Sequence, residues 1–232
     1  MSVSLARPTL LLVHGAWHGT WCWEKVEAEL ASRGWRSQAV DLPSAVAAES
    51  NDLLPSIFDD AQVIRAAIDG IDGPVVVVAH SYGGVPVTQA TAGAANVVHL
   101  VYLAAFSLDG GESLLSFVGA PQPDPESVTG VLPPRENPPV SFYGDVPDDV
   151  RDDAVSRLVY QSGRSFVDQV TRVGWRTIPS SYIVCDNDQS IAPEVQEKLA
   201  ARTRAVYHLP SSHSPFLSMP GELTELLMKI AA

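Results

Sequence analysis

The chain has 232 residues, of which 46% are hydrophobic and 18% are charged, which is typical of a folded globular protein and excludes a disordered chain. Its formal net charge of -12 disfavours partners such as nucleic acid or an anionic membrane surface. The two cysteines, Cys22 and Cys185, form neither a disulfide framework nor a metal-binding spacing, and the apolar runs are too short to span a bilayer. The amino-terminal residues lack a signal-peptide pattern, so we expect a cytoplasmic protein.

Patterns of buried strands and amphipathic helices alternate along most of the chain. Short apolar runs predict strands at residues 9–13, 35–40, 75–79, 97–104, 182–185 and 205–209. Apolar spacing and end signals predict helices between Thr20 and Gly34, from Ile57 to near Gly70, after the strand at 75–79, from Pro193, and over residues 223–230. The small and polar stretch 44–51 is predicted to be a loop. This alternation predicts an α/β protein with a mainly parallel sheet covered by helices on both faces.

Residues 107–177 interrupt the alternation. Prolines crowd the stretch 121–139, and aromatic side chains such as Phe117, Phe142 and Trp175 make the segment too apolar for a linker. Pro147 and the two aspartates after it predict one helix inside the segment. We interpret residues 107–177 as a cap insertion, folded over the functional site, within a single domain that covers residues 1–232. A packed segment without a gating role is the alternative.

A serine follows the most apolar of these strands. Val75 to Ala79 leads into His80-Ser81-Tyr82-Gly83-Gly84, which approximates the G-x-S-x-G nucleophile elbow with Ala79 in place of the first glycine. In such an elbow the serine adopts a strained backbone conformation that exposes its hydroxyl at the edge of the sheet. Ala79 and Gly83, two residues before and two after the serine, are then expected to approach each other and must be small, and Gly84 lets the next helix pack close to the sheet. Ser81 is therefore the candidate nucleophile.

A serine hydroxyl needs a base, and in this architecture the acid and the histidine follow the serine in chain order. His213 lies in a short polar loop after the last strand, whereas His99 and His208 lie in or beside strands. His80 is adjacent to the serine, but its strand position is expected to point away from the site. Asp186 and Asp188 both follow the strand at 182–185, and spacing alone leaves both open as the acid. We favour Asp188 because it lies further out on the loop, where it can lean toward His213.

Acyl transfer also needs N–H donors for the developing oxyanion. The residue after the nucleophile, Tyr82, supplies one candidate donor. Ala16, in the glycine- and histidine-rich loop 14–19 after the first strand, is the candidate for the other. In an alternative interpretation, His14 and His18 only stabilise a tight turn. No phosphate-binding glycine loop and no metal-ligand spacing is present in the sequence, so we expect no cofactor and no metal.

The residues 13–19, the run 80–84, Asp188 and His213 resemble the α/β-hydrolases, and within them the branch of small esterases and hydroxynitrile lyases that includes plant methyl salicylate esterase. The resemblance covers nearly the whole chain and is weakest in the cap. It implies an α/β-hydrolase fold with a six-stranded sheet, a catalytic triad of Ser81, Asp188 and His213, and an oxyanion hole formed by Ala16 and Tyr82. The lyases of this branch carry a threonine where this chain has Gly15, and a lysine where it has Ser214.

These departures favour ester hydrolysis. We expect a serine esterase that cleaves a small or medium apolar carboxylic ester through an acyl-enzyme on Ser81, with this ester as its small-molecule partner. A hydroxynitrile lyase, a biosynthetic cyclase and a non-catalytic ligand receptor on the same fold are the alternatives, because fold does not determine function. Hydrolases with a carboxylate nucleophile are excluded, since a serine occupies that position.

Overall fold

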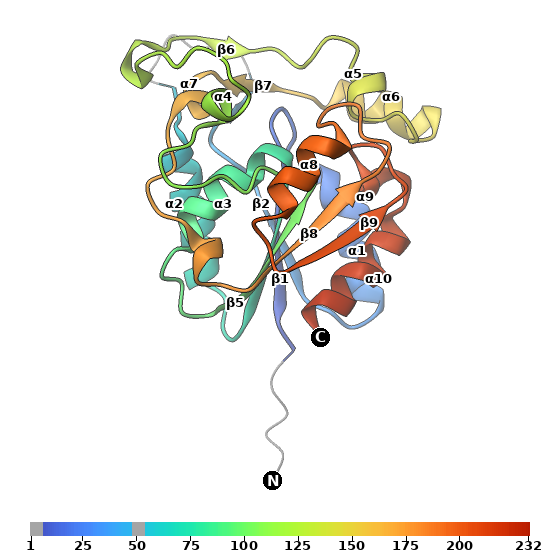
Figure 1. Cartoon of the computed structure of the whole chain (residues 1–232). Helices are drawn as coiled ribbons and strands as arrows, with labels where there is room; N and C mark the ends of the chain where they lie inside the picture. The colour runs from blue at the N-terminus through green and yellow to red at the C-terminus, as the bar shows by residue number, and fades with distance from the viewer. Residues whose placement is uncertain (1–6, 48–53) are drawn as a thin grey trace.

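A six-stranded parallel sheet, in the order β2-β1-β4-β5-β8-β9, forms the centre of the computed structural model, which describes residues 7–47 and 54–232 (Figure 1). All neighbouring strands of this sheet pair in parallel, which confirms the predicted sheet. Its strands are β1 (Thr9–Val13), β2 (Ser37–Val40), β4 (Val75–His80), β5 (Val97–Leu103), β8 (Ser180–Cys185) and β9 (Ala205–Leu209). The strands expected to begin at Trp35 and Tyr182 begin two residues later and two residues earlier, respectively.

Burial differs between the centre and the edges of the sheet. Every residue of β1 and β4 is buried, as expected for central parallel strands with both faces covered. The edge strands β2 and β9 alternate between half-buried and exposed positions, and only the last residue of each is buried. The carboxyl end of β4, where the Ser81 turn begins, therefore lies in a fully buried part of the sheet.

Two pairs of long helices cover the sheet. Helix α1 (Glu24–Ser32) packs against α10 (Pro220–Ala231), and α2 (Ile57–Asp69) packs against α3 (Gly84–Thr91). Figure 1 shows the sheet between these two pairs, which confirms the predicted layers. The remaining helix of the alternating pattern is α8 (Pro193–Ala200). Among the helices of the described residues, none is both long and apolar enough to cross a membrane.

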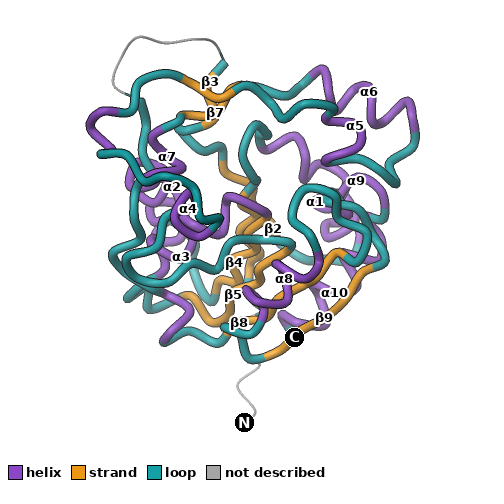
Figure 2. The backbone as a smooth tube through the Cα atoms, turned by 45° about the horizontal axis from the view of Figure 1, so that its top comes forward, coloured by secondary structure: helices purple, strands orange, loops and turns teal. Residues whose placement is uncertain are grey.

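Most of the segment between β5 and β8 lies near the carboxyl ends of the strands, at the top of Figure 1 and toward the viewer in Figure 2, and its last residues return to the start of β8. It holds short elements: α4 (Leu114–Phe117), η3 (Pro125–Ser127), β6 (Val131–Leu132), α5 (Pro138–Ser141), α6 (Asp148–Ser156), β7 (Tyr160–Ser162), α7 (Arg164–Val167) and η4 (Gly174–Arg176). Short elements elsewhere are η1 (Thr20–Trp23), η2 (Ser81–Gly83) and α9 (Pro215–Ser218). The helix predicted after Pro147 is α6.

The expected loop 44–51 is partly wrong. Strand β3 (Ala45–Val46) pairs antiparallel with β7, and β7 pairs antiparallel with β6, so the three form a small second sheet. A strand of two residues has no pattern of its own and exists only through its distant partner. Residues 48–51 of the expected loop lie outside the described residues.

Two glycines bring the backbone of the Ser81 turn close to its neighbours. A Cβ atom on Gly83 would clash with the carbonyl oxygen of His14, and one on Gly84 would lie 2.6 Å from the carbonyl oxygen of Phe106. These obstacles are backbone atoms, so they cannot rotate away. The predicted close packing of Gly84 is confirmed, and the nearest obstacle to Gly83 is the loop after β1 rather than Ala79.

We predict that Gly84→Ala destabilises the protein by about 1–3 kcal/mol, because the added methyl group overpacks the contact between α3 and the residues after β5. The matched control is Gly221→Ala in α10, where a Cβ atom would meet nothing within 4 Å. That variant should be neutral or up to about 1 kcal/mol more stable, through helix propensity. Urea denaturation of both variants measures the difference, and equal stabilities would contradict the packing argument.

Candidate active site

Ser81 occupies the turn that the elbow pattern predicts. It follows β4 directly, and its φ of 53° lies in the left-handed region, which confirms the expected strained backbone. Its carbonyl oxygen accepts a hydrogen bond from the N–H of Phe106 at 3.1 Å. A Cβ atom on Gly15 would lie 2.8 Å from the Cβ of Ser81, so the loop after β1 packs directly against the serine.

His213 and Asp188 form a buried hydrogen-bonded pair. His213 lies in the loop between β9 and α9, and its Nδ1 is 2.7 Å from Oδ2 of Asp188, with both side chains buried. Because a carboxylate only accepts, Nδ1 donates, and Nε2 is left to accept a proton. This is the arrangement that a general base needs.

Three further donors hold Asp188 in place. Its Oδ1 accepts hydrogen bonds from the N–H groups of Ser190 at 2.6 Å and Ile191 at 3.0 Å. Its Oδ2 also accepts from Nε2 of Gln196 at 2.9 Å. Gln196 is itself fixed by the backbone of Cys185, whose N–H donates to Oε1 at 3.0 Å. The carboxylate therefore faces His213 in one orientation.

Asp186, the other acid considered from spacing, binds a different histidine. Its Oδ1 lies 2.8 Å from Nδ1 of His208, and this pair is solvent-exposed. Its backbone N–H donates to the carbonyl oxygen of Leu209 at 2.9 Å, so the residue continues the β8–β9 pairing. The geometry thus distinguishes the two acids, which spacing does not.

His80, expected to point away from the site, packs against His213. The two rings are 4.6 Å apart, and Nε2 of His80 donates to the carbonyl oxygen of His213 at 2.9 Å. Desolvation lowers the pKa of the buried His80 well below its ordinary value, so the ring is neutral at pH 7. A neutral His80 supports the backbone of His213 without adding a positive charge beside it.

His14 and His18 shape the loop that contains Ala16. Nδ1 of His14 lies 2.8 Å from the carbonyl oxygen of Gly15, and Nδ1 of His18 lies 2.8 Å from that of Ala16. The hydroxyl of Tyr143 lies 2.8 Å from Nε2 of His18. Burial lowers the pKa of both histidines, to about 3 for His18. Among the described residues, no acceptor binds the N–H of Ala16, which is the condition for an oxyanion donor.

Tyr82, the other candidate donor residue, is fixed by its side chain. The buried phenol donates to Oδ2 of Asp60 at 2.6 Å, and the hydroxyl of Ser44 donates to the same oxygen at 2.6 Å. The N–H of Ser44 donates to Oδ1 of Asp60 at 2.9 Å. Desolvation raises the pKa of Asp60 from its ordinary 3.8 to about 6, against the effect of these donors.

A cavity of about 290 Å³ opens beside Ser81. Its lining includes the two candidate oxyanion residues, and most of its remaining side chains are apolar: Ala16, Trp17, Ser81, Tyr82, Phe106, Leu114, Leu115, Val118, Arg135, Phe166, Ser190 and Ile191. Several of these come from the 107–177 segment, so that segment forms a wall of the cavity. The space suits a small, largely apolar ligand.

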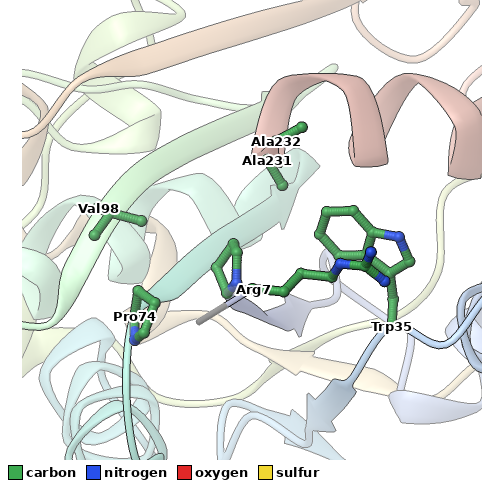
Figure 3. Close-up of a pocket in the computed structure, with 7 residues that line it drawn as sticks. Arg7, Trp35, Pro74, Val98, Ala231 and Ala232 are labelled. Carbon is green, nitrogen blue, oxygen red and sulfur yellow. The ribbon is translucent and has the colours of Figure 1, made fainter. Parts of the chain in front are cut away.

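A second cavity, of about 430 Å³, lies at the opposite end of the strands (Figure 3). There the guanidinium of Arg7 stacks on Trp35, 4.8 Å from the ring centroid, and donates to the carbonyl oxygen of Gly34 at 3.3 Å. The remaining walls are apolar residues such as Val98. The described residues that line this larger cavity combine no nucleophile with a base, so volume alone does not identify the site.

Sequence reasoning missed Gln196 and Asp60, and it misjudged His80. Gln196 and Asp60 carried a signal, because each is a polar residue on the apolar face of its helix. Asp60 follows Ile57 by three residues, and Gln196 precedes Leu199 by three. Within residues 7–47 and 54–232, no group of three or more His, Cys, Asp or Glu side chains is arranged to hold a metal ion.

We predict that Asp60 makes folding stability depend on pH in a window of about 4–6. Because burial raises its pKa in the folded state, its contribution is complete below about pH 4 and is lost as the pH rises through about 6. The shift corresponds to roughly 3 kcal/mol. The buried histidines have lowered pKa values, so their contribution to folding stability rises with pH in this range, opposite to that of Asp60. The measurement is therefore the difference in unfolding free energy between Asp60→Asn and the unmodified protein, from pH 4 to 7.5, and a constant difference would contradict the prediction.

The chain is similar to a known protein family, to individual proteins and to solved structures. A model of the "Alpha/beta hydrolase family" matches residues 10–226. The chain is 26% identical to Alpha/beta hydrolase nvfD of Aspergillus novofumigatus, over 98% of both chains, and 25% identical to Methylesterase 1 of Arabidopsis thaliana, over 100% of this chain and 98% of that one. A pyrethroid hydrolase structure from Sphingobium faniae superposes over 97% of both chains with a TM-score of 0.79 at 23% identity, which shows the shared fold. The protein belongs to the alpha/beta hydrolase family.

Proposed function

We propose that this protein is a serine esterase that cleaves small, largely apolar carboxylic esters. The observation that carries the proposal is the buried 2.7 Å hydrogen bond between Nδ1 of His213 and Asp188, in a chain whose strained Ser81 directly follows the central strand β4. This bond selects the tautomer in which Nε2 of His213 is free to accept the proton of a serine hydroxyl.

In the proposed mechanism, Oγ of Ser81 attacks the carbonyl carbon of the ester while His213 takes the hydroxyl proton. Asp188 orients the imidazole and stabilises its positive charge. The N–H groups of Ala16 and Tyr82 bind the oxyanion of the tetrahedral intermediate. The intermediate collapses as His213 gives its proton to the alcohol, which departs. A water molecule, deprotonated by His213, then hydrolyses the acyl-enzyme and frees the acid.

The cavity beside Ser81 supports a small substrate. Its volume is about 290 Å³, and side chains such as Leu114, Val118 and Phe166 make it largely apolar. We propose that residues 107–177, which contribute these side chains, act as the cap of a single domain. The names of the related methylesterases and of the pyrethroid hydrolase are in line with an ester as the substrate class.

Two positions favour hydrolysis over cyanohydrin cleavage. A threonine in place of Gly15 would put its Cβ 2.8 Å from the Cβ of Ser81, so the loop geometry of this protein requires glycine. Ser214, where the lyases of the related branch carry lysine, is fully buried, and no described residue binds its hydroxyl. A charged ammonium at this position would face a large desolvation cost. These local constraints support the esterase.

We predict that a fluorophosphonate probe reacts once per chain, at Ser81. Ser81 lies in the strained turn beside the candidate oxyanion donors, and the probe reacts only with such an activated hydroxyl. Intact mass and peptide mapping measure the adduct, and Ser81→Ala should abolish both labelling and the turnover of p-nitrophenyl acetate. Labelling at another serine of the folded protein would refute the assignment.

We predict that Asp188→Asn lowers kcat by up to about 10⁴-fold, because it removes the acceptor that sets the His213 tautomer. Asp186→Asn is the matched control, since that exposed residue binds His208 and should lose less than about tenfold. Steady-state kinetics on the same ester, with circular dichroism to verify folding, measures both. If Asp186→Asn were the inactive variant, the acid would be misassigned.

A further inference from the structure

Residues of the 107–177 segment form hydrogen bonds with the loop 14–19, which contains the candidate oxyanion donor Ala16. Trp17, the residue after Ala16, has a φ of 65°, which a non-glycine residue adopts only when its surroundings enforce it. Three hydrogen bonds join it to that segment. Its N–H donates to Oε1 of Gln161 at 3.3 Å, its indole N–H donates to the carbonyl oxygen of Leu132 at 3.0 Å, and its carbonyl oxygen accepts from Val159 at 3.0 Å.

The orientation of the Gln161 side chain follows from its neighbours. Its Nε2 lies 2.8 Å from the hydroxyl oxygens of both Ser44 and Ser165. The proton of Ser44 is committed to Asp60, and that of Ser165 to the carbonyl oxygen of Ser162 at 2.7 Å. Both hydroxyls can therefore only accept from Gln161, which fixes the NH₂ group toward them and Oε1 toward Trp17.

The same hydrogen-bond network reaches the side chain of Tyr82, the residue whose N–H is the second candidate oxyanion donor. Ser44, which accepts from Gln161, donates to Asp60, and Asp60 accepts from the phenol of Tyr82. Gln161, Ser44, Asp60 and Tyr82 are all fully or almost fully buried, so water does not compete for these bonds. A continuous chain of hydrogen bonds thus runs from the Trp17 N–H to Tyr82 through one amide in β7.

We propose that Gln161 is a positioning residue that sets the geometry of the oxyanion hole. It holds the peptide next to Ala16 on one side and, through Ser44 and Asp60, the Tyr82 side chain on the other. The inference rests on the proposed function, because it assigns a role in stabilising the oxyanion. Loss of one complete oxyanion donor costs about 10²–10³ in kcat, so a displaced donor should cost less.

A purely structural role for Gln161 predicts a different result. If its bonds only secured β7, its loss would lower stability or widen the cavity, which raises KM. A positioning role lowers the rate of every reaction that forms an oxyanion on Ser81 and leaves KM nearly unchanged. Reaction with a fluorophosphonate also places negative oxygen in the oxyanion hole, so it reports on the geometry independently of the natural substrate.

The test compares Gln161→Met with Ser162→Ala. Methionine keeps the length of the side chain and removes both polar ends. Ser162 is the neighbouring buried residue of β7, and its hydroxyl donates to the carbonyl oxygen of Pro55 at 2.6 Å rather than to Trp17. For each variant we would measure thermal stability, the rate constant of fluorophosphonate labelling at Ser81, and kcat and KM on p-nitrophenyl acetate.

We expect Gln161→Met to lower labelling and kcat together by about 10- to 100-fold, with KM within about twofold. Ser162→Ala should lose stability without this loss of rate. Should Gln161→Met fail to fold, Ser165→Ala removes one of the two groups that orient the amide, and it should show about a threefold loss in the same direction.

Two outcomes separate the inference from the proposed function. Labelling of the folded Gln161 or Ser165 variant at the unmodified rate, or an equal loss in Ser162→Ala, overturns the positioning role. An unmodified protein that labels at Ser81 but hydrolyses no ester refutes the esterase, while the labelling rates still decide the role of Gln161.

Discussion

The candidate site depends on how closely the Ser81 turn packs against the backbones of its neighbours. Gly15 lies against the Cβ of Ser81, Gly83 lies against the carbonyl of His14, and Gly84 lies against the backbone of Phe106. A side chain at any of these glycines would force the loops after β1 and β5 away from the serine. The close contacts hold Ser81 in its left-handed conformation and bring the loop with Ala16 beside it. The strain of the turn, about 1–3 kcal/mol, is offset by the surrounding core.

Burial determines which groups around the serine carry charge. His14, His18 and His80 are enclosed and have lowered pKa values, so they act through directed hydrogen bonds as neutral rings. His213 is the histidine that faces a buried carboxylate, and Asp188 is in turn held by backbone donors. In the proposed mechanism, this fixed pair orients the imidazole of His213 toward the reacting groups. The neutral rings provide rigidity around it.

The sequence alone was sufficient to predict the features that depend on a local residue pattern. Strands such as β4 were predictable because their apolar runs are continuous, and Ser81 because small residues surround it in a fixed pattern. The choice of Asp188 over Asp186 needed the family resemblance as well as the position of Asp188 further out on the loop. Asp188 does contact His213, and its catalytic role stays a proposal.

What the sequence could not provide depends on distant partners. Strand β3 exists through its pairing with β7, more than a hundred residues away along the chain. No sequence pattern marks Gln161. Its proposed role depends on hydrogen bonds with Trp17 and Ser44, which only the fold brings close to it. His80 was misjudged because strand alternation does not indicate that the loop of His213 folds back over it.

The most direct test of the proposed chemistry is a crystal structure of the protein after reaction with an alkyl fluorophosphonate. The mechanism predicts phosphorus bonded to Oγ of Ser81 and one phosphonyl oxygen within about 2.7–3.1 Å of the N–H groups of both Ala16 and Tyr82. Nε2 of His213 should lie within hydrogen-bond distance of the adduct, with Asp188 still on Nδ1. An adduct on another residue, or a phosphonyl oxygen directed away from both N–H groups, would contradict the account.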